Sequence, residues 1–215
     1  MSGNLDIEGP AKLFAQIDPH IIALQEVDEL RPRSNFIRQT VFLARELGMN
    51  YVFGPATRYP IGAYGNALLS KFPFLSSSNH PLPSKYERRA FLEAQILLNG
   101  QVITVITTHL GLDSQERTRQ LREFLLPLVK KQANAAVLLG DFNAPEDSKE
   151  IKMVARNLHD TFKSNSGLID CTFPSSNPHV RIDYIFINSH CKCDDFYIVD
   201  SQISDHLPAV ANIII

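Results

Sequence analysis

The chain has 215 residues, of which 44% are hydrophobic and 20% are charged, and its formal net charge is −2. These values are ordinary for a globular protein with one substantial core, and they exclude a strongly basic chain with a general attraction to nucleic acid. No apolar stretch is long enough to cross a membrane, and the amino terminus does not resemble a signal peptide. Three cysteines cannot all pair, which favours a reducing compartment. We therefore expect a cytoplasmic protein.

The amino-terminal half of the sequence mixes helical and strand patterns. The expected elements, in chain order, are a helix at 9–17, a strand at 20–27, a helix at 34–48 and strands at 51–54 and 65–70. Pro10 suits the first turn of the first helix. Ser34 is the expected N-cap of the second helix and Gly48 its expected end.

The carboxy-terminal half continues the mixture without a repeat or a linker, so residues 1–215 are expected to form one domain. The expected elements are a hairpin at 93–109, a helix at 113–131, a strand at 136–139, a helix at 148–157 and strands at 181–187, 195–202 and 209–215. Asn99-Gly100 is a strong hairpin signal, and it excludes an all-parallel sheet. Asp113 and Glu116 form a capping box, and Pro127 is expected to kink or end the helix. An α/β or α+β layered sandwich suits this order.

Five apolar runs carry acidic, amide or imidazole side chains at an end or within. These residues are Glu26, His109, Asp141 with Asn143, Asp183, and Asp205 with His206. Because strand ends of packed sheets can meet at one rim, we expect these side chains to form a site. The set is rich in oxygen and contains no cysteine, which favours Mg²⁺, Mn²⁺ or Ca²⁺ over structural zinc.

The stretch Asp141-Phe142-Asn143 follows a buried strand. If it is extended, Asp141 and Asn143 point to the same side and reach one substrate group, while Phe142 enters the core. An Asx turn leading into the next segment explains the same residues equally well. Asp183 lies inside an apolar strand, where a lone carboxylate is costly, and His206 is its candidate partner. A histidine oriented by a carboxylate suits phosphoester hydrolysis.

The other residues have ordinary structural interpretations when each is taken alone. Glu26 can end a strand at the surface, His109 can be a satisfied core histidine, and Asp205 can cap a turn. Arg58 and Arg89 can hold a phosphate or belong to a solvated loop. The combination of the acids, amide and histidines therefore carries more weight than any one of them.

Six motifs in order, IIALQEVD, GNALLSKFP, TTHLG, LLGDFNAPED, RIDYIF and SDHLPAV, resemble the endonuclease/exonuclease/phosphatase family. The resemblance implies a four-layer αββα sandwich of two mixed sheets flanked by helices. It also implies Mg²⁺-dependent phosphoester hydrolysis, with Mn²⁺ as a possible substitute. The substrate is expected to be a nucleic acid, a phospholipid head group or a small phosphodiester, and the protein is expected to be a monomer. A catalytically impaired protein that binds phosphorylated ligands on the same fold is the alternative.

The resemblance also assigns expected roles to the individual residues. It implies a metal site at Glu26 and Asp205, a water- and phosphate-positioning pair at Asp141 and Asn143, a catalytic dyad of Asp183 and His206, a leaving-group or phosphate contact at His109, and a site-lining amide at Asn66. Together with Arg58 and Arg89 as candidate phosphate ligands, these residues make up the expected site.

One departure from the family concerns its first strand, which normally ends in an asparagine near the metal. The opening stretch MSGNLDIEG resembles the segment after that strand. Relative to the family, the domain is therefore expected to be truncated at its amino terminus. Loss of an inner strand leaves unpaired backbone groups and an open sheet edge. We hypothesise that the natural start of the protein lies upstream.

Overall fold

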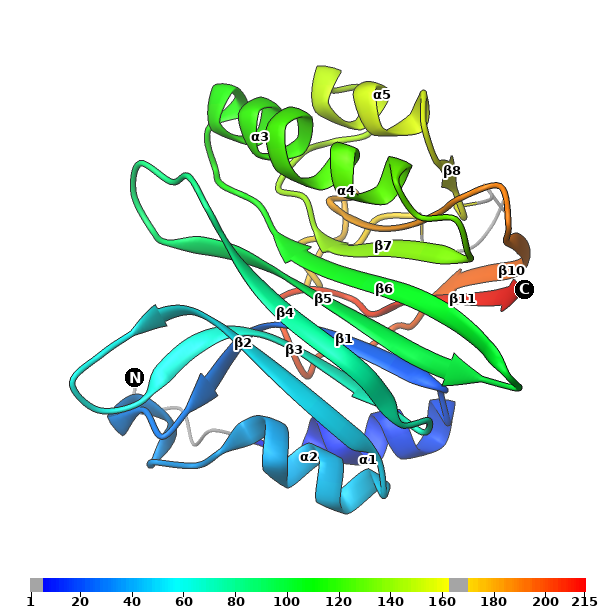
Figure 1. Cartoon of the computed structure of the whole chain (residues 1–215). Helices are drawn as coiled ribbons and strands as arrows, with labels where there is room; N and C mark the ends of the chain where they lie inside the picture. Colours follow the sequence, from blue (N-terminus) through cyan, green and yellow to red (C-terminus); the bar gives the residue numbers. More distant parts are fainter. Residues whose placement is uncertain (1–5, 163–169) are drawn as a thin grey trace.

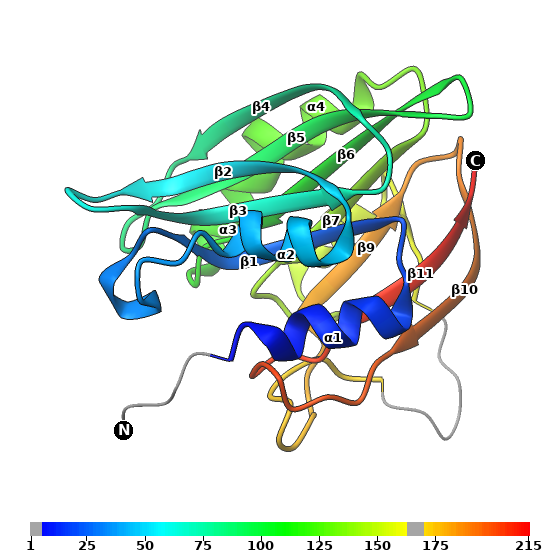
Figure 2. The ribbon, with the colours of Figure 1, turned by 90° about the horizontal axis from the view of Figure 1, so that it is seen from below.

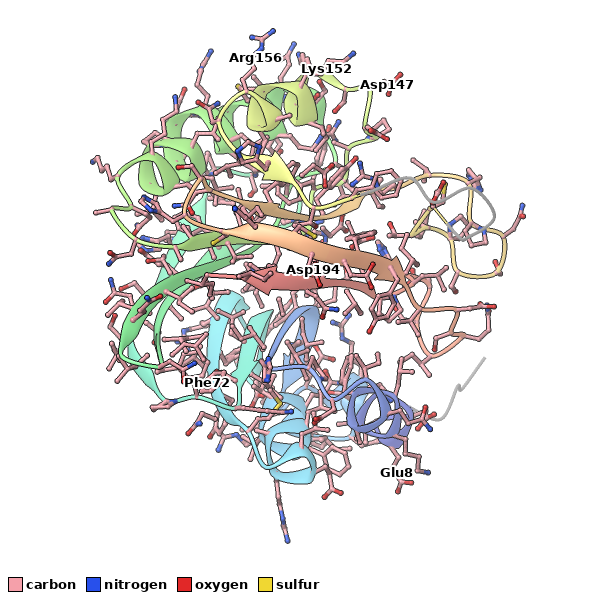
Figure 3. The ribbon with its side chains drawn as sticks, turned by 90° about the vertical axis from the view of Figure 1, so that its right-hand side faces the viewer. Glu8, Phe72, Asp147, Lys152, Arg156 and Asp194 are labelled. Atoms are coloured by element: carbon pink, nitrogen blue, oxygen red, sulfur yellow. The ribbon has the colours of Figure 1, made fainter. Side chains whose placement is uncertain are left out.

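The computed structural model describes residues 6–162 and 170–215. Two β layers pack face to face, and helices cover the outer face of each (Figure 1). One layer is covered by α1 (Glu8–Ile17) and α2 (Gln39–Leu47), and the other by α3 (Ser114–Gln120), α4 (Leu126–Lys130) and α5 (Lys149–Ala155). Figure 3 places charged residues on both outer faces, with Glu8 on α1 and Lys152 and Arg156 at α5. The predicted α/β sandwich is therefore confirmed.

The layer next to α3, α4 and α5 is one mixed sheet with the strand order β4-β5-β6-β7-β9-β8. Its strands are β4 (Phe74–Leu82), β5 (Arg89–Leu98), β6 (Gln101–His109), β7 (Ala136–Asp141), β8 (His159–Asp160) and β9 (Asp183–Ile187). The β6–β7 pair is parallel, and the other pairs are antiparallel.

The layer next to α1 and α2 is divided into two pieces. One piece is a three-stranded antiparallel sheet in the order β1-β3-β2, and the other is the antiparallel pair β10-β11. The strands are β1 (Ile21–Glu29), β2 (Asn50–Arg58), β3 (Ala63–Ser70), β10 (Lys192–Ile198) and β11 (Ala209–Ile214). Within the described part of the chain, β1 and β11 each have a strand on one side alone. Within the described residues this layer therefore consists of two antiparallel pieces, and the parallel pairing lies in the six-stranded sheet.

Three clusters of buried apolar residues join the four layers. One lies between the six-stranded sheet and its helices, and includes Phe142, Leu121 and Phe186. A second lies between the two β layers, and a third joins β1 and β3 to α1 and α2. Phe142 is fully buried, as predicted. Each sheet is thus held on both faces, so its strand ends are rigid supports for a site.

Local signals in the sequence located most of the elements. Asn99 and Gly100 have positive φ in the β5–β6 turn, and the Asp113 side chain accepts a hydrogen bond from the Glu116 N–H at 3.0 Å. The predicted start of α2 was wrong, because Ser34 lies in the 3-10 turn η1 (Pro32–Ser34) and two residues with positive φ follow it. At Pro127 the helix does not end. The helix continues from α3 through the π-helical turn η2 (Leu121–Leu125) into α4, which contains Pro127 in its first turn.

The described helices include none that is both long and apolar enough to cross a membrane. Cys171 and Cys191 carry free thiols.

Gly140 offers a test of how tightly β7 packs against β6. It has a φ of 134°, and a Cβ there would collide with the carbonyl oxygen of Thr108 on β6. Gly140→Ala is expected to lower the free energy of unfolding by about 2–4 kcal/mol, because backbone strain and the clash add. Urea denaturation followed by circular dichroism measures the change.

Gly100→Ala is the matched control. Gly100 also has a positive φ, of 82°, but a Cβ there meets no atom within 4 Å. Its substitution is expected to cost about 1 kcal/mol through backbone strain alone. Equal costs at the two positions would show that the approach of β7 to β6 is not tight.

Candidate active site

Three neighbouring strands end at the same rim of the six-stranded sheet. The strand register places His109 of β6 beside Asp141 of β7, and Asp141 opposite Asp183 of β9. β6 and β7 end at this rim and the antiparallel β9 begins there. The residues of each strand next to the rim are mostly buried, so the polar side chains gather where the strands leave the core. The sequence-based expectation that these three residues meet agrees with this geometry.

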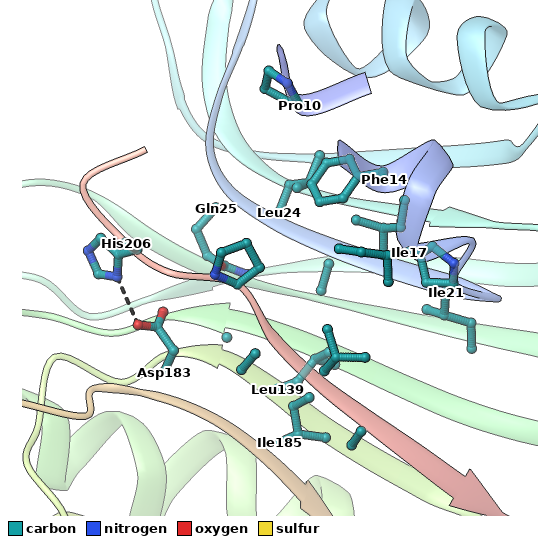
Figure 4. A pocket seen from close by; sticks show the side chains of 18 of the residues that line it. Pro10, Phe14, Ile17, Ile21, Leu24, Gln25, Leu139, Asp183, Ile185 and His206 are labelled. Atoms are coloured by element: carbon teal, nitrogen blue, oxygen red, sulfur yellow. Dashed lines mark hydrogen bonds and ion pairs between the residues drawn. The ribbon is translucent and has the colours of Figure 1, made fainter. Parts of the chain in front are cut away.

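His206 and Asp183 lie within hydrogen-bond distance, with 2.8 Å between Nδ1 and Oδ2 (Figure 4). The Thr172 hydroxyl accepts the N–H of Asp183 at 3.3 Å, and the Phe173 ring lies 4.8 Å from the His206 ring. Burial lowers the pKa of His206, but the hydrogen bond and charge of Asp183, with the charges of Asp141 and Asp205, outweigh burial and raise it to about 9. The imidazole is therefore a cation at neutral pH.

Asp141 is buried, and its Oδ2 lies 3.3 Å from Nε2 of His109. Burial and the negative charge of Asp183 raise the pKa of Asp141 to about 7, although the N–H of Asn143 partly offsets this effect. A carboxyl group with a pKa in this range can both release and accept a proton near neutral pH.

Asn143 departs from the predicted extended geometry. Its φ is 48°, and its N–H donates to Oδ1 of Asp141 at 2.7 Å, so the chain forms an Asx turn. Its side-chain amide donates to the carbonyl of Leu110 at 2.9 Å. The expectation that Asn143 and Asp141 project together from an extended strand was therefore wrong. Asn143 instead fixes the Asp141 carboxylate and ties the turn to the end of β6.

His109 is buried, and burial lowers its pKa to about 3, helped by the positive charges of Arg89 and His206. Arg89 is also buried, and its guanidinium pairs with Glu87 at 2.7 Å while its Nε has no hydrogen-bond partner. The structure thus places a fixed positive charge next to a neutral imidazole. Arg58, by contrast, is exposed at the end of β2, and no described interaction links it to this cluster.

Glu26 comes from the opposite layer and faces His109, with 3.9 Å between Oε1 and Nδ1. It lies in a bulge of β1 between Leu24 and Val27 and has a φ of 60°. Its side chain is 63% exposed. Sequence reasoning missed Tyr64, which hydrogen-bonds to Glu26; burial and that bond raise the pKa of Tyr64.

The remaining predicted residues lie at different depths. Asp205 is exposed and precedes His206, and its backbone carbonyl accepts the N–H of Ser175 at 2.7 Å. Asn66 is fully buried, and its amide donates to the carbonyl of Ala90 at 2.7 Å. Asn66 therefore links β3 to the strand that carries Arg89, below the site. The sequence did contain a signal for Tyr64. It lies two residues before Asn66 on one strand, so the two side chains are expected on the same face of the sheet.

The side chains at this rim offer oxygen donors, the type that a hard divalent cation prefers. Among the described residues, no three His, Cys, Asp or Glu side chains form a group that could hold a metal ion alone. Mg²⁺ needs one or two carboxylates and completes its shell with water and phosphate oxygens. Glu26 and Asp205 are the exposed carboxylates here. A cation beside them would also offset the repulsion between Asp141 and Asp183.

The sandwich, the aligned carboxylates and the hydrogen-bonded histidine define a member of a phosphoesterase fold family. The Endonuclease/Exonuclease/phosphatase family matches residues 11–206, and the chain belongs to it. Members of this family are generally hydrolases that act on phosphoesters.

Three similar proteins illustrate the relationship. The uncharacterized protein YbhP of Escherichia coli is 29% identical over 181 residues, which are 80% of this chain and 71% of YbhP. An endonuclease/exonuclease/phosphatase structure from Beutenbergia cavernae has a TM-score of 0.81 at 21% identity, and the match covers 98% of this chain and 66% of that one. The Bacteroides thetaiotaomicron mannosyl-6-phosphatase Bt3783 has a TM-score of 0.80 at 16% identity, with 97% and 90% covered. The last two comparisons support the fold.

The pairing of His206 with Asp183 can be tested directly. In the metal-free chain, NMR titration of the His206 ring is expected to give a pKa of about 9. In Asp183→Asn it is expected to fall to about 6.5 or below, because the raising charge is lost while burial remains. Since the folded-state pKa exceeds the unfolded value, the pair stabilises the fold fully below about pH 6.5, and this contribution disappears as pH rises through about 9. An unchanged His206 pKa in the variant would contradict the assignment.

Proposed function

We propose that the protein is a metal-dependent phosphoester hydrolase that acts on phosphodiesters. The observation that carries this proposal is the alignment of His109, Asp141 and Asp183 on three adjacent strands, with His206 hydrogen-bonded to Asp183. Family membership supports the reaction class. The metal requirement and the roles of the residues belong to the proposal.

The charge of each side chain determines its proposed role in catalysis. Asp141, with its pKa raised to about 7, is the proposed acceptor of the proton from the attacking water. The His206 cation and the buried Arg89 guanidinium stabilise negative charge on the phosphoryl oxygens. Asp183 holds the His206 imidazole in place, and the Thr172 hydroxyl fixes the backbone of Asp183. The N–H of Asn143 fixes the Asp141 carboxylate.

Glu26 and Asp205 are the residues that would hold a divalent cation. When bound, the cation supplies charge neutralisation at the phosphate and helps to ionise water. Tyr64 orients Glu26 through its hydrogen bond.

The surroundings of the site favour a substrate with an apolar portion. Exposed apolar side chains lie in loops between β1 and α2, between β2 and β3, before β5 and after β6, and these are Leu30, Phe36, Tyr59, Ile61, Tyr86 and Leu112. Of the expected substrates, phospholipid head groups fit this surface best, because the exposed residues can contact the lipid portion. The B. thetaiotaomicron relative is named as a mannosyl-6-phosphatase, so a phosphomonoester belongs in the same substrate panel.

Hydrolysis of an aryl phosphodiester by the purified chain tests the reaction class. Turnover is expected with Mg²⁺ or Mn²⁺ and not with EDTA. His206→Ala is expected to lower kcat by about 10²–10³, the usual contribution of one group that stabilises transition-state charge. His190→Ala is the matched control, because His190 is exposed and lies beyond the opposite end of β9. Equal activity of the two variants would overturn the assignment of His206.

Metal binding has a readout that does not depend on turnover. Glu26→Gln is expected to weaken Mn²⁺ binding, measured by electron paramagnetic resonance of the metal with the chain, by about tenfold or more. Glu46→Gln, on the exposed face of α2, is expected to bind Mn²⁺ like the unaltered chain. Unchanged Mn²⁺ affinity in Glu26→Gln would refute the metal site, and metal binding without hydrolysis of any substrate would favour a phosphate-binding protein on this fold.

A further inference from the structure

Four loops at one end of the sandwich present large apolar side chains to solvent. They are the β1–α2 loop, the β2–β3 turn, the β4–β5 loop and the β6–α3 loop. The side chains that they expose, called the apolar rim below, are Leu30, Phe36, Tyr59, Ile61, Tyr86 and Leu112. Figures 1 and 2 both show the β2–β3 turn and the β4–β5 loop at the end of the molecule opposite the β5–β6 turn.

The apolar rim lies at the same end of the molecule as the candidate active site. The strand register places the ends of β1 and β2 beside Ala63, where β3 begins, and places the start of β5 next to the end of β6. His109 closes β6 and faces Glu26 of β1 in the opposite layer. The four loops therefore extend from both layers at the end where the site meets solvent.

The backbone of the β1–α2 loop holds two of these side chains outward in an unusual conformation. Leu30 and Phe36 have φ values of 58° and 57°, in the left-handed region that bulky residues rarely adopt. Both amides are nevertheless satisfied, since the N–H of Leu30 donates to the Ile37 carbonyl at 3.0 Å and that of Phe36 to the Arg31 carbonyl at 2.9 Å. Strained residues persist where the surrounding structure fixes them, and they gather at functional sites. The exposure of Leu30 and Phe36 is thus built into the loop.

Arg31 joins this loop to the β2–β3 turn. Its guanidinium carbon lies 3.3 Å from the centre of the Tyr59 ring, and its Nη1 donates to the carbonyl of Ile61 at 3.3 Å. Arg33 of the same loop is held by two hydrogen bonds of 2.8 Å to the Asp28 carboxylate. The two loops of this layer therefore form one fixed surface.

The two loops of the other layer are fixed by buried polar residues of α3. Glu116 accepts the N–H of Lys85 in the β4–β5 loop at 2.9 Å. Gln120 accepts the N–H of Gly111 in the β6–α3 loop at 2.9 Å and donates to the carbonyl of Pro83 at 2.9 Å. A preorganised surface loses little conformational entropy when it binds a partner.

The charge of these loops differs from that of the whole chain. Residues 30–38, 58–62, 83–88 and 110–113 contain six Lys or Arg and two Asp or Glu, whereas the formal net charge of the chain is −2. Three of the six cations pair with neighbouring carboxylates. The other three, Arg31, Arg58 and Arg88, form no ion pair with another described residue. The apolar rim is therefore accompanied by positive charge.

Apolar side chains with arginines between them suit the surface of a lipid bilayer. Leucine, isoleucine and phenylalanine enter the boundary between head groups and acyl chains, and tyrosine is enriched at that depth. Arginine is attracted to anionic lipids and binds their phosphates. A nucleic-acid surface would use the arginines but would leave Leu30, Ile61 and Leu112 without apolar contacts.

We propose that the apolar rim and its arginines dock the protein on an anionic phospholipid bilayer, with the candidate active site facing the head groups. Leu30, Phe36, Tyr59 and Ile61 enter the bilayer surface from one layer of the sandwich, and Tyr86 and Leu112 enter it from the other. Hydrolysis of the head groups at that surface rests on the proposed function, whereas docking does not.

Co-sedimentation with vesicles tests the docking. Vesicles of phosphatidylcholine with about 30% phosphatidylserine are used in EDTA, so that neither hydrolysis nor a bridging metal contributes. The unaltered chain is expected to bind them, and to bind less in high salt. Phe36→Ser combined with Ile61→Ser is expected to lower the partition coefficient by about tenfold or more, because two inserted apolar side chains are lost. Arg58→Gln combined with Arg88→Gln is expected to lower it by about tenfold.

Tyr51→Ser combined with Leu75→Ser is the matched control. These residues lie at the starts of β2 and β4, at the end of the sandwich away from the site. They are 42% and 51% exposed, compared with 54% for both Phe36 and Ile61. The control variant is expected to bind the vesicles like the unaltered chain.

A fluorescent reporter tests the contact without removing an apolar side chain. The chain contains no tryptophan, so Phe36→Trp and Leu75→Trp each introduce a single one. Brominated phospholipid in the same vesicles is expected to quench the fluorescence of Phe36→Trp and to leave that of Leu75→Trp unchanged.

Three outcomes would overturn the proposal. The first is absence of binding to the anionic vesicles by the unaltered chain. The second is an equal loss of binding, or equal quenching, in the variants at the two ends of the sandwich. The third is dimerisation of the unaltered chain that Phe36→Ser with Ile61→Ser abolishes, without vesicle binding, which assigns the apolar rim to a second copy.

Docking and hydrolysis are measured separately. Vesicle binding without turnover of any phosphoester contradicts the proposed function and supports docking. Turnover of the aryl phosphodiester without vesicle binding supports the proposed function and contradicts docking.

Discussion

The alignment of β6, β7 and β9 is the constraint on which the site depends. Asp141 closes β7 and has His109 beside it on one strand and Asp183 on the other. A shift of one residue in either pairing would turn these side chains to the opposite face of the sheet. Gly140 permits the close parallel approach of β7 to β6, and Phe142 anchors the chain in the core directly after Asp141. The site is therefore fixed by the same contacts that hold the sheet together.

This geometry separates the proton affinities of three groups that lie close together. Burial acts on each of them, but it favours the neutral form, so it raises the pKa of Asp141 and lowers that of His109. His206 is less buried and bonded to Asp183, so its pKa rises instead. A proton acceptor, a neutral imidazole and a cation result from one cluster. This division of roles suits acid–base chemistry at a phosphate.

Local sequence signals predicted the elements whose structure depends on neighbouring residues. The Asn99-Gly100 turn, the Asp113 cap and the end of α2 at Gly48 follow from side-chain and backbone preferences within a few positions. The Asp183–His206 pair was predictable because a carboxylate inside an apolar strand needs a partner.

Features set by distant contacts were not predictable in the same way. The turn at Asn143 depends on a hydrogen bond to the Leu110 carbonyl, and Tyr64 reaches Glu26 because β1 and β3 pair in one particular register. Arg89 was expected either to hold a phosphate or to belong to a solvated loop, but its backbone starts a strand and its side chain is buried beside Glu87. For Asn143 and Tyr64 the partner is far away in sequence, so periodicity and spacing carry no signal for it.

The two halves of the site differ in how firmly they are held. His109 and Asp141 belong to the continuous sheet and are less than 10% exposed, whereas Glu26 belongs to the divided layer and its side chain is 63% exposed. Preorganised groups stabilise a transition state without the cost of reorganisation, and groups on an open strand edge lack that advantage. Continuity of the divided layer therefore bears on chemistry as well as on stability. Ordering of the exposed Glu26 carboxylate is therefore a cost of metal binding that the buried groups of the continuous sheet do not share.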